Sequence, residues 1–282
     1  MKVLRSILEM RQALQSYRTD SSSIGLVPTM GALHEGHLSL LSQSLQNNQV
    51  TVCSIFVNPI QFNNPEDLKK YPRDEKKDFE LLEKAGCDMV FVPSSHEMYQ
   101  DDSAAIKMNF GEIENVLEGK FRPGHFSGVG VVVSKLFNIV QPDKAYFGQK
   151  DLQQLAVIKQ MVKALNFPIE VHAVPIMRED NGLAMSSRNQ RLNEEERETA
   201  SVLYKSMLLM KSALNEGSSI ETAKQKATEM LAKNNNIDLE YMELVDADTM
   251  EIFENTTSKN ALSICAAAYI SGVRIIDNLY IH

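Results

Sequence analysis

The hydrophobic positions of this chain follow two spacings, and each spacing predicts one kind of element. Short apolar or β-branched runs predict buried strands, and longer stretches with apolar residues three or four apart predict amphipathic helices. Before residue 180 the two kinds of segment alternate. We expect strands at "SIGLVPT", "VTVCSIFVN", "DMVFVP", "DKAYFG" and "IEVHAVP". We expect helices at 2–17, 37–46, "DEKKDFELLEKAG", "GVGVVVSKLFNIV" and "DLQQLAVIKQMVKALN", the fourth on its length, because its composition also suits a strand.

This alternation gives about five β-α units and predicts an α/β fold with a doubly wound parallel sheet. Ligands of such sheets bind outside the carboxyl ends of the strands. Several polar side chains of this sequence follow the predicted strands at that edge. They are His34, His37, Asn58, Gln61 and the "GQKD" segment at 148–151.

The pattern changes after "MSSRNQRL". Two predicted helices, at 193–216 and 219–234, precede the predicted strands "DLEYMELVD", "ALSICAAAYI" and "VRIIDNLYI". Helices followed by strands predict a separate, smaller α+β domain. We therefore expect one domain over 1–187 and a second over 188–282.

The composition mainly argues against some classes of function and location. The 282 residues carry a net charge of −8, which gives no general support for nucleic-acid binding. The three cysteines are far apart, lack CxxC spacing and stand in apolar surroundings, so we expect small buried side chains. Charges interrupt the first fifteen residues, and no uncharged apolar stretch approaches the ~18 residues that cross a bilayer. A cytoplasmic protein without a membrane partner is the expectation.

The segment "PTMGALHEGHLSLL" contains two histidines in a turn after the first predicted strand. Zinc-binding histidines on a helix are usually four apart; here His34 and His37 are three apart with Gly36 between them, so metal binding is poorly supported. Capping of a strand-helix turn is the plain alternative. The position of His37 at a helix start favours an anion, and an imidazole there can donate to phosphate oxygens.

The segment "GLAMSSRN", residues 182–189, is the second candidate. Two serines before an arginine more often cap a helix than form a site. A glycine loop with two hydroxyls and one guanidinium is also suited to hold a triphosphate.

Together the two segments resemble the two ATP signatures of the superfamily of nucleotidylyltransferases and class I aminoacyl-tRNA synthetases. The chain is most similar to the pantoate–β-alanine ligase family, through "LVPTMGALHEGHLSLL", "SIFVNPIQFNNPEDLKKYPR", "LEGKFRPGHFSGVGVVVSKLFNIVQPDKAYFGQKDLQQL" and "VPIMREDNGLAMSSRNQRL". The resemblance implies a Rossmann-like domain and a C-terminal lid. It also implies a reaction in two steps: (R)-pantoate and ATP give pantoyl-adenylate and pyrophosphate with Mg²⁺ present, and β-alanine then gives pantothenate and AMP.

The resemblance also implies roles for residues that match the family motifs. His37, His34, Lys150 and Arg188 would act in catalysis, and Asp151 would bind magnesium, although it could equally cap the helix that follows it. Met177 would contact adenine through its backbone. The full implied ATP site comprises Met30, Gly31, Ala32, Leu33, His34, Glu35, Gly36, His37, Gly148, Gln149, Lys150, Asp151, Met177, Met185, Ser186, Ser187 and Arg188. Gln149 stands where the family commonly has glutamate, and we expect no loss of activity from it.

For pantoate the resemblance implies Gln61, Gln154, Asn58 and Arg122, with Gln61 also reaching β-alanine. A lone glutamine is usually an uninformative surface residue, and His125 in "RPGHF" could be structural. A homodimer is implied as well. The rival interpretations are a nucleotidylyltransferase of the same superfamily and a noncatalytic nucleotide-binding module.

Overall fold

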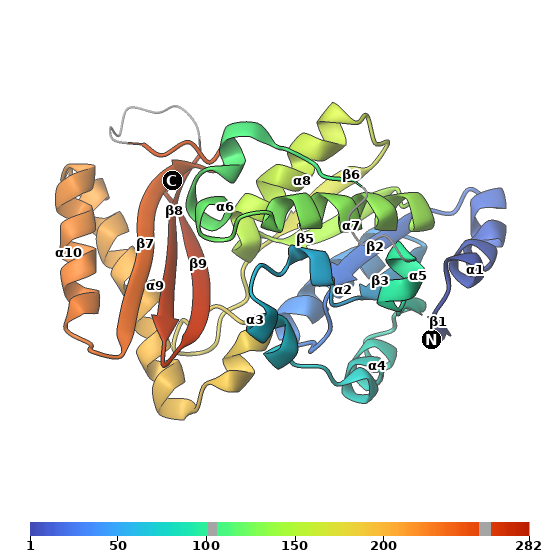
Figure 1. Cartoon of the computed structure of the whole chain (residues 1–282), viewed down its shortest axis with the longest axis horizontal. Coiled ribbons are helices and arrows are strands. Elements are labelled where there is room, and N and C mark those ends of the chain that lie inside the picture. Colours follow the sequence, from blue (N-terminus) through green and yellow to red (C-terminus); the bar gives the residue numbers. More distant parts are fainter. Residues whose placement is uncertain (101–105, 254–260, 282) are drawn as a thin grey trace. The chain divides into compact units, whose positions relative to one another are not determined.

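The chain folds into two compact units, and the computed structural model describes residues 1–100, 106–253 and 261–281 (Figure 1). The first unit comprises Met1–Gln149 and Val157–Pro175, and the second comprises Lys150–Ala156 and Ile176–His282. The short stretch 150–156 therefore groups with the C-terminal part of the chain. The expected domain boundary between residues 187 and 188 stays a prediction.

A six-stranded sheet with every pairing parallel forms the centre of the first unit. Its order is β1-β4-β3-β2-β5-β6, so the chain builds outward from β2 on one side and then returns to the other side. The predicted doubly wound parallel sheet is confirmed. The strands are β1 (Lys2–Leu4), β2 (Ile24–Thr29), β3 (Val50–Ile55), β4 (Met89–Phe91), β5 (Lys144–Gly148) and β6 (Glu170–Val174).

The N-terminal segment differs from the prediction of a single helix at 2–17. Residues Lys2–Leu4 form β1, which pairs with β4, and the helix α1 runs over Ile7–Thr19. Ser6 caps α1 by accepting the N–H of Glu9, and the Glu9 carboxylate accepts the N–H of Ser6. This capping box fixes where the helix begins. Strand β1 is therefore stabilised by pairing with β4, which lies more than eighty residues later in the sequence.

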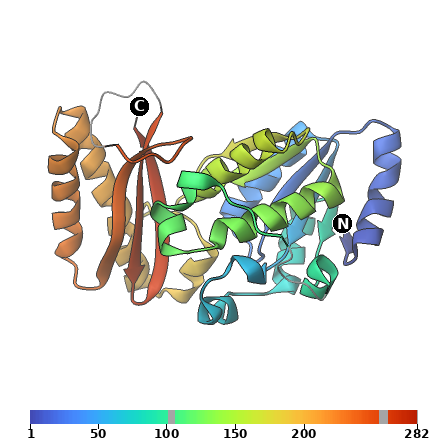
Figure 2. The ribbon, with the colours of Figure 1, turned by 45° about the horizontal axis from the view of Figure 1, so that its top comes forward.

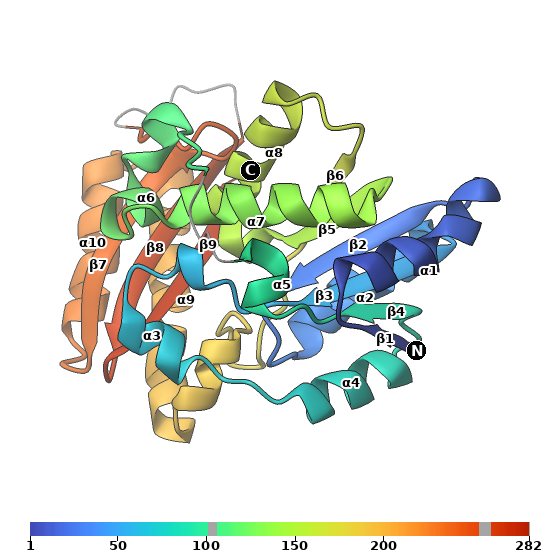
Figure 3. The ribbon, with the colours of Figure 1, turned by 45° about the vertical axis from the view of Figure 1, so that its right-hand side comes forward.

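Helices cover both faces of this sheet, as Figures 1 and 3 show. On one face α2 (Glu35–Asn47) and α4 (Glu75–Lys84) bury Leu41 and Leu82 against side chains of β2, β3 and β4. On the other face α7 (His125–Val140) packs beside α1. The remaining helices are α3 (Pro65–Lys70), α5 (Ser95–Tyr99), α6 (Leu117–Phe121) and α8 (Leu152–Ala164).

The second unit contains a three-stranded antiparallel sheet of order β7-β8-β9 with two helices packed against it (Figure 2). Its core joins Leu203 and Met207 of one helix to Ala266 and Ala268 of the central strand. The predicted α+β arrangement is confirmed. The elements are α9 (Glu194–Asn215), α10 (Ile220–Ala232), β7 (Ile237–Asp246), β8 (Leu262–Ile270) and β9 (Val273–Ile281).

Two further predictions concern the cysteines and membrane-spanning helices. Cys53, Cys87 and Cys265 are free and buried, as their apolar neighbours predicted. Burial raises the pKa of the Cys87 thiol to about 11, so it stays protonated at neutral pH. Within the described ranges, no helix has both the length and the apolar character that crossing a membrane requires.

Candidate functional site

The loop after β2 is the first element of the site, because the sheet order reverses between β2 and β5. Thr29 ends β2, and Gly31 and Ala32 follow with φ of +78° and +50°. A left-handed conformation costs a residue other than glycine about 1 kcal/mol. Surrounding contacts must therefore hold Ala32 in this shape.

Four successive backbone N–H groups of this loop donate to side chains. Gly31 donates to Thr29 Oγ1 at 3.2 Å, Ala32 to Asp78 Oδ2 at 2.9 Å and Leu33 to Asp78 Oδ1 at 2.7 Å. His34 donates to His37 Nδ1 at 3.4 Å. In the described part of the chain, no hydrogen bond uses the N–H groups of Glu35 and Gly36, the first two residues of α2. Those two groups remain to bind an anion at this helix start.

The two histidines lie together at the start of α2, with ring centroids 4.0 Å apart. His34 is the N-cap, and its carbonyl oxygen accepts the N–H of His37 at 2.8 Å. The predicted capping role is therefore present. Because Nδ1 of His37 accepts a hydrogen bond, its neutral ring carries the proton on Nε2. His37 thus presents an N–H donor on the ring nitrogen farther from the backbone.

Gln61 is buried in the first unit, with 6% of its surface exposed. It ends a 3-10 turn, Pro59–Gln61, that follows β3. Its Oε1 accepts from Asn58 at 3.1 Å, and its Nε2 lies 3.2 Å from the sulfur of Met30. A thioether is a weak acceptor. The amide group of Gln61 therefore keeps donor capacity for a stronger partner.

Asn58 is more buried still, at 1% exposed, and its carboxamide is fully engaged by the protein. Its Nδ2 donates to Gln61 and to the carbonyl of Gly128 at 3.1 Å, and its Oδ1 accepts from the Tyr99 hydroxyl at 2.6 Å. Burial raises the pKa of Tyr99, so the hydroxyl remains a donor. This arrangement suits Asn58 to orient Gln61.

Arg122 and His125 extend the same network. His125 Nδ1 lies 2.8 Å from the carbonyl oxygen of Gln61, and its Nε2 lies 3.1 Å from Arg122 Nη1. Since a carbonyl only accepts, the proton of the neutral ring is on Nδ1, and Nε2 accepts from the guanidinium. Glu118 lies 3.4 Å from the same Nη1. Both ring nitrogens of His125 are therefore bonded to protein groups, which supports the structural role that the sequence left open.

The second unit contains the "GQKD" residues from Lys150 onward. Lys150 Nζ lies 3.8 Å from the carboxylate of Asp151, and Asn278 of β9 donates to the Lys150 carbonyl at 2.8 Å. Asp151 is half-exposed, and Gln154 in the first turn of α8 is half-buried. Gly148, the last residue of β5, and Gln149, the first residue of a 3-10 turn, precede them in the first unit.

A tight hairpin places Met185 of the second motif beside Met177. Met185 donates its N–H to the carbonyl of Met177 at 2.9 Å, and Gly182 turns the chain with φ of +94°. A side chain at Gly182 would lie 2.6 Å from the ring of Tyr204. The Arg178 guanidinium stacks on that ring and binds both carboxylate oxygens of Asp277, at 2.6 and 3.0 Å.

Ser186 of this motif has the capping role that the sequence offered as an alternative. Ser186 Oγ accepts the N–H of Arg188 and caps the 3-10 turn Ser187–Arg191. Ser187 is buried and Arg188 is half-buried. Since Asp277 and Asn278 are neighbours in the middle of β9, this one strand anchors both the Arg178 hairpin and the Lys150 segment.

Several residues of these networks carry no signal in the sequence interpretation. Arg178 and Asp277 are 99 positions apart, and neither belongs to a recognisable spacing. Asp78 offered one signal. It lies four residues before Leu82 and therefore on the same, buried face of α4, a helix whose other residues are mostly charged. A carboxylate at such a position is unusual unless it is bonded.

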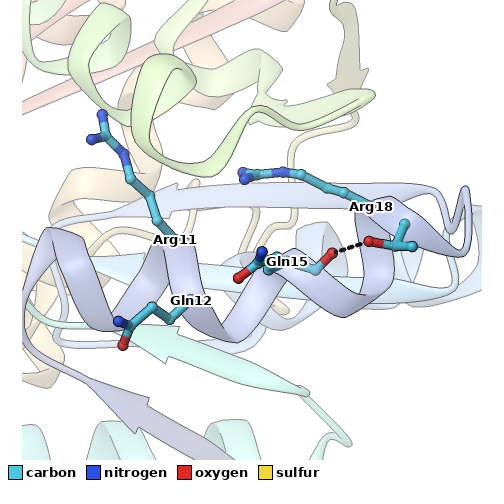
Figure 4. Close-up of a pocket in the computed structure, with 5 residues that line it drawn as sticks. Arg11, Gln12, Gln15 and Arg18 are labelled. Atoms are coloured by element: carbon cyan, nitrogen blue, oxygen red, sulfur yellow. Dashed lines mark hydrogen bonds between the residues drawn. The ribbon is translucent and has the colours of Figure 1, made fainter.

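A concavity of about 480 Å³ on α1 contains none of the predicted site residues (Figure 4). Arg18, on its wall, donates to the carbonyl of Val140 at 2.8 Å and so caps the end of α7. We assign this arginine a structural role. The lining residues are Arg11, Gln12, Gln15, Arg18 and Thr19.

One carboxylate, that of Asp151, could bind a magnesium ion as predicted. Among the residues described, no three His, Cys, Asp or Glu side chains form a metal cluster. Mg²⁺ commonly binds one or two carboxylates together with substrate phosphates and water. The half-exposed Asp151 fits that mode.

Known proteins resemble this chain over its whole length. A profile of the family described as pantoate-beta-alanine ligase matches residues 2–280. A pantothenate synthetase of Cytophaga hutchinsonii is 47% identical over 279 residues, 99% of this chain and 98% of its own length. One of Caldicellulosiruptor bescii is 48% identical over 282 residues, 100% of this chain and 99% of its own.

Solved structures agree in fold. The pantothenate synthetase of Thermus thermophilus has a TM-score of 0.93 and 40% identity, with 100% of both chains covered. A pantoate-beta-alanine ligase of Francisella tularensis, complexed with beta-gamma ATP and beta-alanine, has a TM-score of 0.83 and 35% identity over 99% of this chain and 97% of its own. With the family profile and the full-length relatives, these matches show that the chain belongs to the pantoate–β-alanine ligase family.

Proposed function

We propose a route for the reaction that this ligase carries out, the formation of pantothenate from pantoate and β-alanine with ATP. A carboxylate oxygen of pantoate attacks the α-phosphorus, and the bond from that phosphorus to the bridging oxygen of pyrophosphate breaks. The amine of β-alanine then attacks the acyl carbon, the bond to AMP breaks, and the amine loses a proton. No bond to the protein forms in either step.

His37 carries the charge stabilisation in the first step of this proposal. Negative charge grows on the leaving pyrophosphate, and an N–H donor aimed at that charge lowers the barrier. The observation that supports this role is the hydrogen bond from the His34 N–H to His37 Nδ1, which leaves the proton on Nε2. The N–H groups of Glu35 and Gly36 and the dipole of α2 favour phosphate at the same helix start.

The second unit supplies cations to the nucleotide in this proposal. Lys150 and Arg188 neutralise phosphate charge, Ser186 and Ser187 bind phosphate oxygens, and the Met177 backbone contacts adenine. The anchoring of both segments by Asp277 and Asn278 supports these roles, because charge stabilisation requires donors that are already held in position.

Pantoate is assigned to the network around Gln61. The amide group of Gln61 binds pantoate and then β-alanine, with Gln154 and Arg122 as further polar groups. Asn58 acts mainly by orienting Gln61, since its own polar atoms are bonded to protein. A neutral amide suits a substrate carboxylate that must remain nucleophilic.

Asp151 would hold Mg²⁺ together with the phosphates of ATP. The ion would neutralise phosphate charge when bound. We expect chelation of divalent cations by EDTA to abolish turnover and excess Mg²⁺ to restore it. The homodimer and the cytoplasmic location stay predictions from the sequence.

Exchange of labelled pyrophosphate into ATP tests the adenylate route directly. The assay contains enzyme, ATP, Mg²⁺ and pantoate but no β-alanine. We expect exchange that requires pantoate and does not occur with acids lacking its hydroxyl groups. Synthesis of pantothenate without any such exchange would exclude a reversibly formed pantoyl-adenylate.

A further inference from the structure

Asp78 is a buried carboxylate to which the route above gives no role. It lies in the first turn of α4 and is 2% exposed. Both of its oxygens point to one target, the N–H groups of Ala32 and Leu33 in the loop before His34. A substituent on Gly31 would also lie 2.9 Å from Oδ2, so the loop passes close against this carboxylate.

The bonding pattern separates this residue from an ordinary buried acid. A carboxylate that serves only its own helix binds the helix N-terminus, as Asp74 does by accepting the N–H of Lys77 at 3.1 Å. Asp78 instead binds a segment 45 residues earlier. Burial raises the pKa of Asp78, and the two N–H donors oppose that rise. The buried carboxylate is therefore stabilised by its bonds to this loop.

The loop that Asp78 holds leads directly to the two histidines. Ala32 has the left-handed φ of +50°, and Leu33 and His34 follow in sequence. The orientation of the His34 N–H, which fixes the ring of His37, depends on the path of these residues. Small displacements of a catalytic group are costly, since a shift of about 1 Å can lower a rate by about 10²-fold.

We propose that Asp78 is a positioning residue of this active site: its carboxylate fixes the Gly31–Leu33 turn and thereby orients His34 and His37 toward ATP. The inference rests on the proposed role of the histidines. It assigns Asp78 no contact with substrate and no proton transfer. Its effect is expected in the rate of adenylation and hardly in the affinity for pantoate.

Asp78→Asn is the first test, because it keeps the shape and removes one of two acceptors. One amide oxygen can still accept, while the amide nitrogen faces a backbone N–H and cannot. We expect kcat for pantoate-dependent pyrophosphate exchange to fall by about 10- to 100-fold, with KM for pantoate changed by less than about threefold. Measurements at a temperature where circular dichroism shows the variant fully folded separate this effect from a loss of stability.

Asp74→Asn is the matched control. It removes the same charge from the same helix, and asparagine caps a helix as well as aspartate does. Because Asp74 does not touch the loop, kcat and KM should stay within about twofold of the parent protein. An equal fall in kcat for both variants would make charge on α4 the cause and would overturn the inference.

A double-mutant cycle with His37→Ala tests whether Asp78 acts through the histidine. Residues that act as one unit have effects that do not add. In the His37→Ala background, Asp78→Asn should lower kcat by less than about threefold. An undiminished effect there, or a loss that appears only as a raised KM, would overturn the inference.

Failure of the proposed function has a different signature. If the parent protein shows no pantoate-dependent exchange, the adenylate route itself is wrong. If the parent protein exchanges and Asp78→Asn exchanges equally well, only the positioning role is wrong.

Discussion

The chemistry assigned to His37 depends on which ring nitrogen carries its proton. A backbone donor three residues earlier occupies Nδ1, so Nε2 carries the hydrogen in the neutral ring. His125 has the opposite arrangement, because a carbonyl oxygen lies beside its Nδ1 and a guanidinium beside its Nε2. These two histidines therefore have different neutral tautomers, with the hydrogen on Nε2 in His37 and on Nδ1 in His125.

His37→Ala should slow adenylation by about 10²–10³-fold, the usual effect of removing one donor that stabilises developing charge. The KM for pantoate should change by less than about threefold, since the side chain is assigned to the leaving group. Rates of pantoate-dependent pyrophosphate exchange over a range of pantoate concentrations give both constants. Comparable losses in kcat and in pantoate binding would contradict a role confined to the transition state.

At the scale of elements, the contact between α7 and the turn Pro59–Gln61 positions the pantoate residues. Gly128 of α7 lies so close to this turn that a methyl group would be 2.6 Å from the Ile60 carbonyl oxygen and 2.7 Å from the Gln61 Cα. The Gly128 carbonyl oxygen also accepts from Asn58. The helix therefore sets both the position of Gln61 and the direction of its amide.

Gly128→Ala should raise the KM for pantoate by about tenfold, because the turn must shift to admit the methyl group. Alanine normally stabilises a helix interior by about 1 kcal/mol relative to glycine, so a loss of stability would also indicate the clash. Gly130→Ala is the control: its methyl group would meet the side chains of Phe110 and Met108, away from Gln61. Kinetics of both variants with pantoate as the varied substrate distinguish them, and equal KM values would refute the positioning role of Gly128.

At the scale of the whole molecule, bonds between segments far apart in sequence hold the second motif. Arg178 and Asp277 form a buried pair with two hydrogen bonds, and Asp277 is 6% exposed. Removing one member of a buried pair leaves the other charge without compensation. The stability of this unit and the geometry of the motif therefore depend on the same contact.

Asp277→Ala should lower the free energy of unfolding by about 3 kcal/mol, at the lower end for a buried pair because Arg178 keeps carbonyl partners. Glu75→Ala removes an exposed pair with Arg5 and should cost less than about 1 kcal/mol. Urea unfolding followed by circular dichroism measures both changes. Similar small losses would mean that Arg178 is held by Tyr204 and the carbonyl groups alone.

The pattern of the sequence predicted most of this architecture, including every α-helix of ten or more residues, but not α3, α5 and α6, whose five or six residues are too few for a periodic signal. Strand β1 was missed because its three residues gain their structure from β4. Motif residues such as His37 and Lys150 could be named from the sequence, but the partners that orient them could not. Asp78, Tyr99 and Asp277 belong to no motif, and only the fold brings them to the residues they bind.

The engaged N–H groups between Gly31 and His34 have a consequence for inhibitor design. An acceptor placed on an ATP analogue to reach those four amides would have to break bonds already made to protein side chains, and would gain little. The same acceptor aimed at the amides of Glu35 and Gly36 meets donors that have no such competitor in the described chain. An inhibitor should therefore direct its phosphate mimic to the first turn of α2.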